Sequence, residues 1–465
     1  MDALKIFSVI GLVLYFMILL TIVIKEKKSN TVLDFFFAGR QLPFWVLSIT
    51  FIASWWGAGS ALSTADLAYA DGIGAYWYYG VPVLIATFLL IFLSKIVRSS
   101  SELTQGGMMS KRYNKLVGKT LSLLIMISMT LSAASQMVGV GDFIGSYLGI
   151  EYSTAVFLGS SIVVIYSIFG GFRGVVLTDI VQFVLLLISA VAVFVVAYYN
   201  AGGWSGIEAK AMAENNSSFM SFFDSMADYG AYVLTFGFGW CIQPNVWQRI
   251  TATRNEKDAF RMAVTSFVAY IPLYFIVILT GMAGFVLFED LPKGGVVSGI
   301  VNQYMHPVLG AITFVGISAA IMSTMDSLIN TAAMSLSIDM GIFDDNKEKQ
   351  LAFSRVSTLI VTIIGLFIAL RIPSILKISW IASDIIVTGV LVPLIAGFFW
   401  KRGTWQGAMV SMIMGGAFCF YNLFISLGAD LPKYWELESP QQVVLGVLVS
   451  SFFYFVVSLM TKAEE

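Results

Sequence analysis

The sequence is poor in cysteine, histidine and charged residues. Its 465 residues include two cysteines, one histidine and 12% charged side chains, about half the charged fraction of a typical soluble domain. Cys241 and Cys419 lie in apolar stretches without metal or redox spacing, which indicates buried small side chains. The single histidine, His306, precedes a proline in a polar connection. The composition therefore offers little for a zinc site or for Ser–His hydrolase chemistry.

Hydrophobic residues make up 58% of the chain, more than a water-soluble protein can bury. Lipid can accommodate them, because about 20 apolar residues in a helix cross a bilayer core of roughly 30 Å. The sequence therefore predicts an all-α membrane protein whose surroundings are the lipid bilayer. Its net charge of −1 gives no indication of a nucleic-acid partner. Thirteen transmembrane helices are predicted near residues 5–24, 43–69, 75–97, 118–147, 154–169, 175–199, 229–248, 259–287, 309–337, 353–370, 374–400, 404–428 and 441–461.

The distribution of basic residues predicts the orientation of these helices. With the N-terminus outside and the C-terminus cytoplasmic, most of the 27 Lys and Arg residues fall on the cytoplasmic side or its helix ends. Those assigned to that side include Lys25, Lys27, Lys28, Arg40, Arg98, Lys111, Arg112, Lys115, Arg249, Arg254, Lys257, Lys401 and Arg402. The other side receives Lys5, Lys210, Lys293, Arg371, Lys377 and Lys433. We therefore expect a multi-pass protein of the inner (plasma) membrane of the cell.

The connections between the predicted helices are too short for a soluble domain. The longest external loop, about 200–228, is polar and mixed, and the internal loop after residue 340 is short. The first span is not expected to be a cleaved signal peptide, because no small-residue cleavage site follows it. We therefore expect the function to lie inside the bundle, with no obligatory protein partner.

Acidic residues inside apolar spans are energetically unfavourable in lipid and usually face a cavity or a partner. Asp66, Asp142, Asp179 and Asp384 are such residues, and Asp326 lies in the middle of another span. Each could instead be a helix-end carboxylate that reaches interfacial water. That alternative is weaker for Asp326, because polar residues surround it on its own helix.

The helix around Asp326 carries a stripe of small polar residues. Ala320, Ser323, Thr324 and Ser327 follow i, i+3, i+4, i+7 spacing and share one face. Such a stripe can serve close helix packing. Two adjacent hydroxyls near a carboxylate are also hard oxygen ligands of the kind that a sodium ion needs, and both interpretations stay open.

The second span contains glycines where a regular helix would avoid them. Gly57 and Gly59 follow the paired residues Trp55 and Trp56. Glycine weakens a helix and permits an unwound turn, whose carbonyl groups can coordinate a cation. Broken backbone at membrane depth is tolerated where it lines a cavity, so a binding site is predicted here, with flexible packing as the alternative.

Three segments together resemble the sodium/solute symporter family, which includes sodium/proline, sodium/sugar, sialic-acid, pantothenate and choline transporters. They are DFFFAGRQLPFW (Asp34 to Trp45), GGFRGVVLTDIVQF (Gly170 to Phe183) and AAIMSTMDSLIN (Ala319 to Asn330). The resemblance runs over essentially the whole chain and implies one transmembrane domain, 1–465, with a five-plus-five inverted-repeat core. The repeats would span 43–199 and 229–400, with an extra helix in 1–28 and two more in 404–461.

The resemblance also implies a sodium site near the bilayer midplane. Its ligands would be the backbone carbonyls of Ala53, Trp56 and Ala320 and the hydroxyls of Ser323 and Thr324. Sodium would be the coupling ion and the single kind of metal bound, and no other cofactor is expected.

Some members of the family bind a second sodium. Its ligands would match Asp179, Asp326 and Ser327, together with Ser323. Position 326 is acidic here, where the two-sodium sialic-acid branch has serine. Two carboxylates could strengthen the site, or one could be protonated under the influence of the other, so one or two sodium ions remain possible.

The segment Leu234 to Arg249 resembles the sodium/proline branch, but that branch has an aspartate where this chain has Trp55. Choline-type members have tryptophan there, and a tryptophan face attracts an alkylammonium group by about 0.5–2 kcal/mol. The alternative is that these aromatic rings simply pack the bundle. The predicted substrate-binding residues are Trp55, Gly57, Asp66, Gln136, Phe236, Trp240 and Gln243.

These observations predict a sodium-coupled symporter that imports a small organic solute by alternating access, with an amino acid or another amine-bearing solute favoured. A proton-coupled transporter of the same fold and a sodium symporter specific for sugars or carboxylates are the alternatives. A transporter-like sensor would need a separate signalling partner. An intramembrane hydrolase lacks a His-Glu metal motif and a well-placed Ser/His or Ser/Lys pair, so no enzymatic activity is expected.

Overall fold

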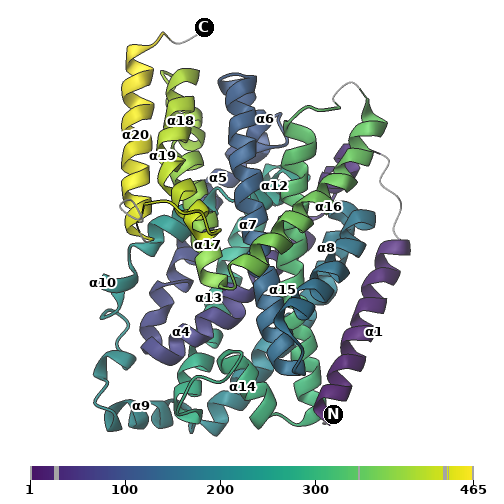
Figure 1. The fold of residues 1–465 in the computed structure, drawn as a ribbon, viewed down its shortest axis with the longest axis vertical. Helices are drawn as coiled ribbons and strands as arrows, with labels where there is room; N and C mark the ends of the chain where they lie inside the picture. Colours follow the sequence, from purple (N-terminus) through teal and green to yellow (C-terminus); the bar gives the residue numbers. More distant parts are fainter. Residues whose placement is uncertain (1–2, 26–30, 344–345, 433–436, 438, 463–465) are drawn as a thin grey trace.

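The chain is all-helical in a computed structural model that describes residues 3–25, 31–343, 346–432, 437 and 439–462 (Figure 1). Across these residues no β-strand forms, and one isolated bridge joins Leu42 to Thr253. Three basic residues used to predict the orientation, Lys27, Lys28 and Lys433, lie outside the described residues.

Within these described ranges, ten helical segments are long and apolar enough to cross a membrane. They comprise α1 (Ala3–Lys25), Gly59–Ser99 with α4 (Thr64–Asp71) and α5 (Gly80–Ser99), α7 (Lys115–Leu148), α8 (Tyr152–Asn200), α13 (Glu256–Leu287), Pro307–Asp339 with α15 (Pro307–Met334), α16 (Lys347–Arg371), Ile375–Phe399 with α17 (Ile375–Ile385) and α18 (Val392–Phe399), α19 (Trp405–Ser426) and α20 (Gln441–Met460). The prediction of a multi-pass, all-α membrane protein is confirmed.

Breaks within the predicted spans explain why ten segments are found where thirteen were predicted. Two predicted spans, 154–169 and 175–199, run together in the 49 residues of α8, which would measure about 74 Å if straight. The chain kinks within α8 at Gly171, where φ is 53° and ψ is −161°. In the predicted span 43–69, the first part, Phe44–Trp55, is too short to qualify, and the second part runs together with the predicted span 75–97 in Gly59–Ser99. The predicted span 229–248 is divided into pieces too short to qualify by length. The count of thirteen therefore stays a prediction.

Each of the two divided spans combines short helices with a π-helical turn and a stretch of non-helical backbone. In the first, α3 (Phe44–Trp55) is capped by Trp56, and a π-helical turn (Gly59–Ser63) leads into α4. In the second, a π-helical turn (Val233–Phe238) and the short α11 (Gly239–Cys241) precede α12 (Pro244–Ala252). Smaller helices complete the described chain: α2 (Val32–Phe37), α6 (Gln105–Arg112), α9 (Gly203–Ala213), α10 (Met226–Tyr229) and α14 (Gly295–Tyr304).

Helix α15 lies at the centre of the bundle. It packs against α7 and α8, and also contacts α1, α3 and α16. Of the 18-residue apolar stretch in the α15 segment, 83% is buried inside the protein. For the corresponding stretch of α1 the share is 22%. Figure 1 shows α1 at the right edge and α19 and α20 at the left edge of the molecule. The central helix is thus shielded from lipid, and polar residues on it can be accommodated.

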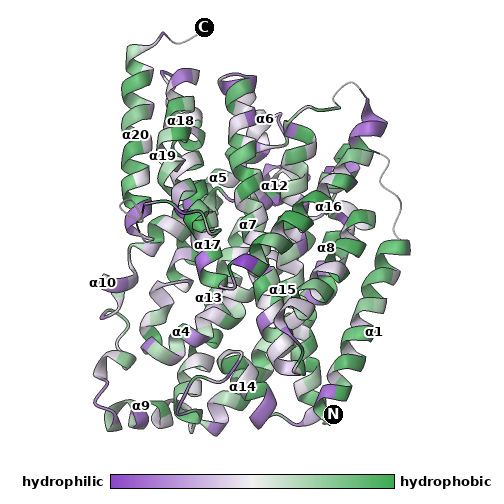
Figure 2. Ribbon diagram, viewed as in Figure 1, coloured by the Kyte–Doolittle hydropathy of each residue, from purple (hydrophilic) through white to green (hydrophobic). Residues whose placement is uncertain are grey.

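The outer helices present apolar side chains to their surroundings. Val13, Leu14 and Met17 of α1 are each more than half exposed. Figure 2 shows hydrophobic residues along the outer helices and hydrophilic residues gathered toward the two ends of the bundle. In Figure 1, α1 begins at the end of the molecule opposite to the one where α20 ends. The prediction that the N-terminus lies outside the cell and the C-terminus in the cytoplasm stays a prediction.

Gly171 is required by the backbone at the kink of α8. Its φ and ψ lie in a region that side chains rarely adopt, and a Cβ there would come within 2.7 Å of the carbonyl oxygen of Phe35. We predict that Gly171→Ala destabilises the protein by about 1–3 kcal/mol, seen as a lower melting temperature in detergent. Gly174→Ala is the matched control, because the added methyl would make an ordinary contact, 3.5 Å from Val23. Equal melting temperatures for both variants would contradict this role of Gly171.

Candidate functional site

The end of α3 meets the middle of α15, and oxygen atoms from both helices gather there. The Ser323 hydroxyl lies 3.0 Å from the carbonyl oxygen of Ala53 and 2.9 Å from that of Ala320. The Thr324 hydroxyl lies 3.3 Å from each of the same two carbonyl oxygens. The structure thus brings together four of the five residues predicted to bind sodium, and all four are buried.

Trp56, the fifth predicted ligand, begins the irregular backbone after α3. Its N–H donates to the carbonyl of Ile52 at 3.1 Å, and its ring packs against Tyr274. Trp56 and Ala320 line the same small cavity. The structure therefore places Trp56 beside the oxygen cluster, while its role as a carbonyl ligand stays a prediction.

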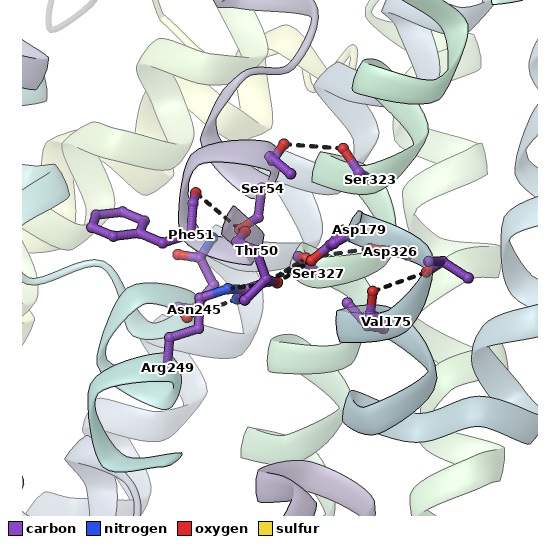
Figure 3. Close-up of polar contacts among 12 residues, drawn as sticks. Thr50, Phe51, Ser54, Val175, Asp179, Asn245, Arg249, Ser323, Asp326 and Ser327 are labelled. Carbon is purple, nitrogen blue, oxygen red and sulfur yellow. Dashed lines mark hydrogen bonds and ion pairs between the residues drawn. The ribbon is translucent and has the colours of Figure 1, made fainter. Parts of the chain in front are cut away.

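A second polar cluster lies in the interior and contains Arg249 (Figure 3). The distribution of basic residues predicts Arg249 at the cytoplasmic side or its helix ends. Instead its side chain is fully buried, with Nη2 3.4 Å from Oδ2 of Asp179, which is also fully buried. A basic side chain this deep is stabilised by its partners, which is the physical reason that it does not follow the surface distribution of the other basic residues.

Further contacts complete this cluster. Nη2 of Arg249 donates to the hydroxyl oxygens of Ser327 at 2.8 Å and Thr50 at 3.0 Å, and Nη1 donates to the carbonyl of Asn245 at 3.0 Å. Thr50 itself donates to Oδ2 of Asp179. The resemblance named Asp179 and Ser327, but not Arg249 or Thr50, as part of this cluster.

Asp326 lies in the same region with different partners. Its carboxylate accepts hydrogen bonds from Tyr166 at 2.8 Å and from Ser327 at 3.3 Å. Asp326, Tyr166 and Ser327 are all buried. The residues predicted to bind a second sodium, Asp179, Asp326 and Ser327, therefore lie close together. The same cluster already contains the guanidinium group of Arg249.

A cavity lies on the other side of the break in α3. Five of the seven predicted substrate-binding residues line it: Trp55, Gly57, Gln136, Trp240 and Gln243. The rest of its lining is Ser54, Gly59, Ser60, Tyr79, Val83, Ser132, Ser135, Thr324, Leu328, Ser379 and Ser383. No charged side chain is among these described lining residues, so the cavity is polar and aromatic but carries no formal charge.

The cavity wall holds the broken backbone close to α7. Oε1 of Gln136 accepts the N–H of Ala58 at 2.8 Å. A Cβ on Gly57 would come within 2.2 Å of that same oxygen and 2.9 Å of the Cβ of Thr324, so a larger residue would press on both α7 and α15. The spacing of Gly57 and Gly59 predicted an unwound turn, and the structure confirms it. The partner of that turn, Gln136, comes from a distant helix.

Aromatic rings form one side of the cavity. The Trp55 and Trp240 ring centroids are 5.9 Å apart, and those of Tyr79 and Trp240 are 4.9 Å apart. The indole N–H of Trp55 is buried and has no hydrogen-bond partner within the part of the chain that the structure describes. Phe236 stacks on Trp240 with centroids 4.5 Å apart but lies behind it, fully buried.

Asp66 lies apart from this cavity. Its carboxylate accepts the N–H of Val296 at 2.8 Å, and it lines a different cavity together with Asp142 and Lys293. Asp384 accepts a hydrogen bond from Gln442 at 2.8 Å, which links α17 to α20. Of the five acidic residues that the sequence singled out, Asp179 and Asp326 therefore share one cluster, Asp66 and Asp142 share one cavity, and Asp384 joins two helices.

Known proteins resemble this chain over nearly its whole length. The high-affinity proline transporter PutP of Bacillus subtilis is 24% identical, over 94% of this chain and 95% of that protein. The sodium/pantothenate symporter of Haemophilus influenzae is 24% identical, over 92% of this chain and 93% of that protein. A substrate-bound, outward-open Na+-coupled sialic acid symporter superposes with a TM-score of 0.78 at 18% identity, covering 100% of this chain and 99% of that one. These relatives are transporters, and the solved structure shares the fold.

The family model for sodium:solute symporters matches residues 35–415, which include both oxygen clusters and the aromatic cavity. A match over this much of the sequence shows the family. The chain belongs to the sodium:solute symporter family.

Proposed function

We propose that the protein couples the downhill movement of sodium to the import of a small amine-bearing solute across the inner (plasma) membrane by alternating access. The observation that carries this proposal is the meeting of the Ala53 carbonyl with the hydroxyls of Ser323 and Thr324 at a break in α3. The proposal includes an inverted-repeat core, 43–199 and 229–400, with helices that flank it. It also includes an orientation with the N-terminus outside. The two divided spans, one in each proposed repeat, support this arrangement.

The oxygen cluster has the chemistry of a reversible sodium site. Its carbonyl and hydroxyl oxygens are neutral, so they can replace water around a monovalent cation without holding a full countercharge beside it. Irregular backbone at the end of α3 directs its carbonyls away from the helix ladder, as in other transporters with broken helices. A neutral site suits an ion that must be released in every transport cycle.

Thr324 provides a physical connection between ion and solute. Its hydroxyl contacts the Ala53 carbonyl, and the same residue lines the aromatic cavity. An ion that draws Ala53 and Thr324 together would also fix one wall of the cavity. Binding of sodium would then favour binding of the solute, and the reverse must hold to the same extent.

The cavity favours a solute whose charges are balanced within the molecule. An ammonium group can rest against the indole faces of Trp55 and Trp240. A hydrogen-bond acceptor on the solute can accept from the Trp55 N–H, which has no partner among the described residues. A solute with one uncompensated charge would lack a charged partner among the lining residues. The proline transporter of Bacillus subtilis carries a zwitterionic amine, which supports an amino acid or a similar solute here.

The sodium assignment is tested by removing both hydroxyls. We expect Ser323→Ala with Thr324→Ala to raise the sodium concentration for half-maximal uptake at least 100-fold, because two ion ligands worth about 1.5–3 kcal/mol each are lost. Uptake of labelled amino acids, betaines, sugars and carboxylates into proteoliposomes measures it. Ser318→Ala is the control, since this buried hydroxyl on the same helix has no hydrogen-bond partner among the described residues. Wild-type sodium dependence in the double variant would refute the site.

The solute assignment is tested at Trp55. Loss of one desolvated ring contact worth about 1–2 kcal/mol predicts that Trp55→Ala raises the apparent solute constant roughly five- to thirty-fold. Trp55→Phe is expected to lose less, because a smaller aromatic face remains. Trp400→Phe is the control, since Trp400 packs on Tyr454 and Phe455 away from the cavity.

Competition between solutes completes this test. Amine-bearing solutes should compete for uptake better than neutral sugars of similar size. If a sugar or a simple carboxylate competes best, and the Phe and Ala variants behave alike, the tryptophans only pack the bundle and the solute class is wrong.

A further inference from the structure

A hollow between the end of α5 and the beginning of α13 gathers positive charge. This basic hollow measures about 870 Å³, and its lining includes four basic side chains: Lys95, Arg98, Arg254 and Lys257. The single acidic side chain among the described lining residues is Glu256. It lies in the first turn of α13, where a carboxylate offsets the helix dipole. No ion pair among the described residues includes any of the four basic side chains, so the hollow keeps a net positive charge.

Two of the four cations are held in place by backbone oxygens. Nε of Arg98 donates to the carbonyl of Thr253 at 2.8 Å, and its Nη2 donates to that of Arg254, also at 2.8 Å. Nε of Arg254 donates in turn to the carbonyl of Gln41 at 2.8 Å. These acceptors are neutral, so both full positive charges remain available to an anion. Because the two guanidinium groups are already positioned, an anion that binds them loses little free energy to ordering the protein.

The two lysines of the basic hollow are exposed and can turn toward a ligand. Nζ of Lys95 lies 4.9 Å from the ring centroid of Phe260, and Lys257 begins the same helix that carries this ring. Arg112 shows a different use of a basic side chain, because it donates to the carbonyls of Gly397 and Trp400 at the end of α18. Lys95 and Lys257 have no such structural contact with the described backbone.

An aromatic face joins the basic hollow to the surface of a membrane span. Phe88, Phe92 and Lys95 follow i, i+4, i+7 spacing on α5 and so share one side of the helix. Phe88 is 48% exposed and Phe92 is 61% exposed. The ring centroids of these two residues are 5.1 Å apart, and that of Phe88 lies 6.1 Å from that of Phe267 on α13. Exposed apolar rings on a membrane span face acyl chains, and here they lead directly to unpaired positive charge.

We propose that the basic hollow binds an anionic phospholipid. Its phosphate would lie among the four basic side chains, and an acyl chain would lie along Phe88 and Phe92. The net charge of the hollow favours an anionic headgroup over a zwitterionic one, and the aromatic face favours a lipid over a soluble anion. Basic residues beside a membrane span attract anionic lipids, which are concentrated in the cytoplasmic leaflet, and the basic hollow is predicted to lie on that side. This inference goes beyond the proposed function and does not depend on the ion or the solute.

The experiment titrates the purified protein in detergent with phosphatidylglycerol and counts bound lipid by native mass spectrometry. The wild type should retain one phosphatidylglycerol under conditions that remove phosphatidylcholine. Lys95→Gln with Lys257→Gln should weaken phosphatidylglycerol binding roughly thirty-fold, because two charged contacts with the headgroup are lost. Lys115→Gln with Lys119→Gln is the matched control, since it removes the same charge from exposed positions at the beginning of α7 that do not line the hollow. This control should bind phosphatidylglycerol as the wild type does.

A third ligand, inorganic phosphate, distinguishes a lipid site from a site for soluble anions. Phosphate at the lipid's concentration should not displace phosphatidylglycerol, and displacement would overturn the lipid assignment. Equal retention of phosphatidylglycerol and phosphatidylcholine by the wild type would overturn the inference, and so would unchanged binding to the double variant of the hollow. The melting temperature of that variant checks its folding, and the lipid preference of the wild type decides by itself if the variant is unfolded. None of these results bears on sodium coupling, which the variants of Ser323 and Thr324 test separately.

Discussion

Backbone polar groups within the bilayer must find partners inside the protein, because lipid offers none. The break after Trp55 exposes such groups at the centre of the bundle, and side chains satisfy them. Gln136 accepts the N–H of Ala58, the Ser60 hydroxyl donates to the carbonyl of Trp55 at 3.0 Å, and Ser323 donates to that of Ala53. The polar residues that maintain the broken helix are therefore the same residues that surround the proposed ion and solute sites.

This sharing of residues explains why the proposed ion and solute sites lie next to each other. A regular helix would keep its carbonyl groups in its own hydrogen-bond ladder and present only side chains. Once the ladder is interrupted, carbonyl oxygens face α15 on one side, while the Trp55 ring faces the cavity on the other. A single irregular turn thus provides both surfaces, and any movement of α3 against α15 would alter both.

The polar groups in the interior form two clusters, one that contains charged side chains and one that is neutral. Buried charges are stable where they are paired and hydrogen-bonded, and Arg249 meets that condition through Asp179, Thr50 and Ser327. Neutral oxygens bind an ion less permanently, which suits a step that must reverse. The fully buried guanidinium joins α3, α8, α12 and α15 and so has a structural role.

The sequence by itself determined the features that depend on local periodicity and composition. A 58% hydrophobic chain with long apolar runs can fold stably as helices in lipid, and this predicted the class. The i, i+3, i+4 spacing placed Ala320, Ser323 and Thr324 on one face of a helix, and the structure confirms that their oxygens are neighbours. Gly57 and Gly59 marked the unwound turn for an equally local reason.

Only the tertiary structure decided which distant residues meet. The Ala53 carbonyl reaches Ser323 across 270 positions of sequence, and Arg249 reaches Asp179 across 70. Periodicity carries no information about such pairs, because they depend on how helices pack and where the chain kinks, as at Gly171. Basic residues are assigned to membrane surfaces by a statistical rule, and a buried ion pair is the exception that requires coordinates. For the same reason the sequence could not show that Asp66, an acidic residue within a predicted span like the others, lies in a separate cavity.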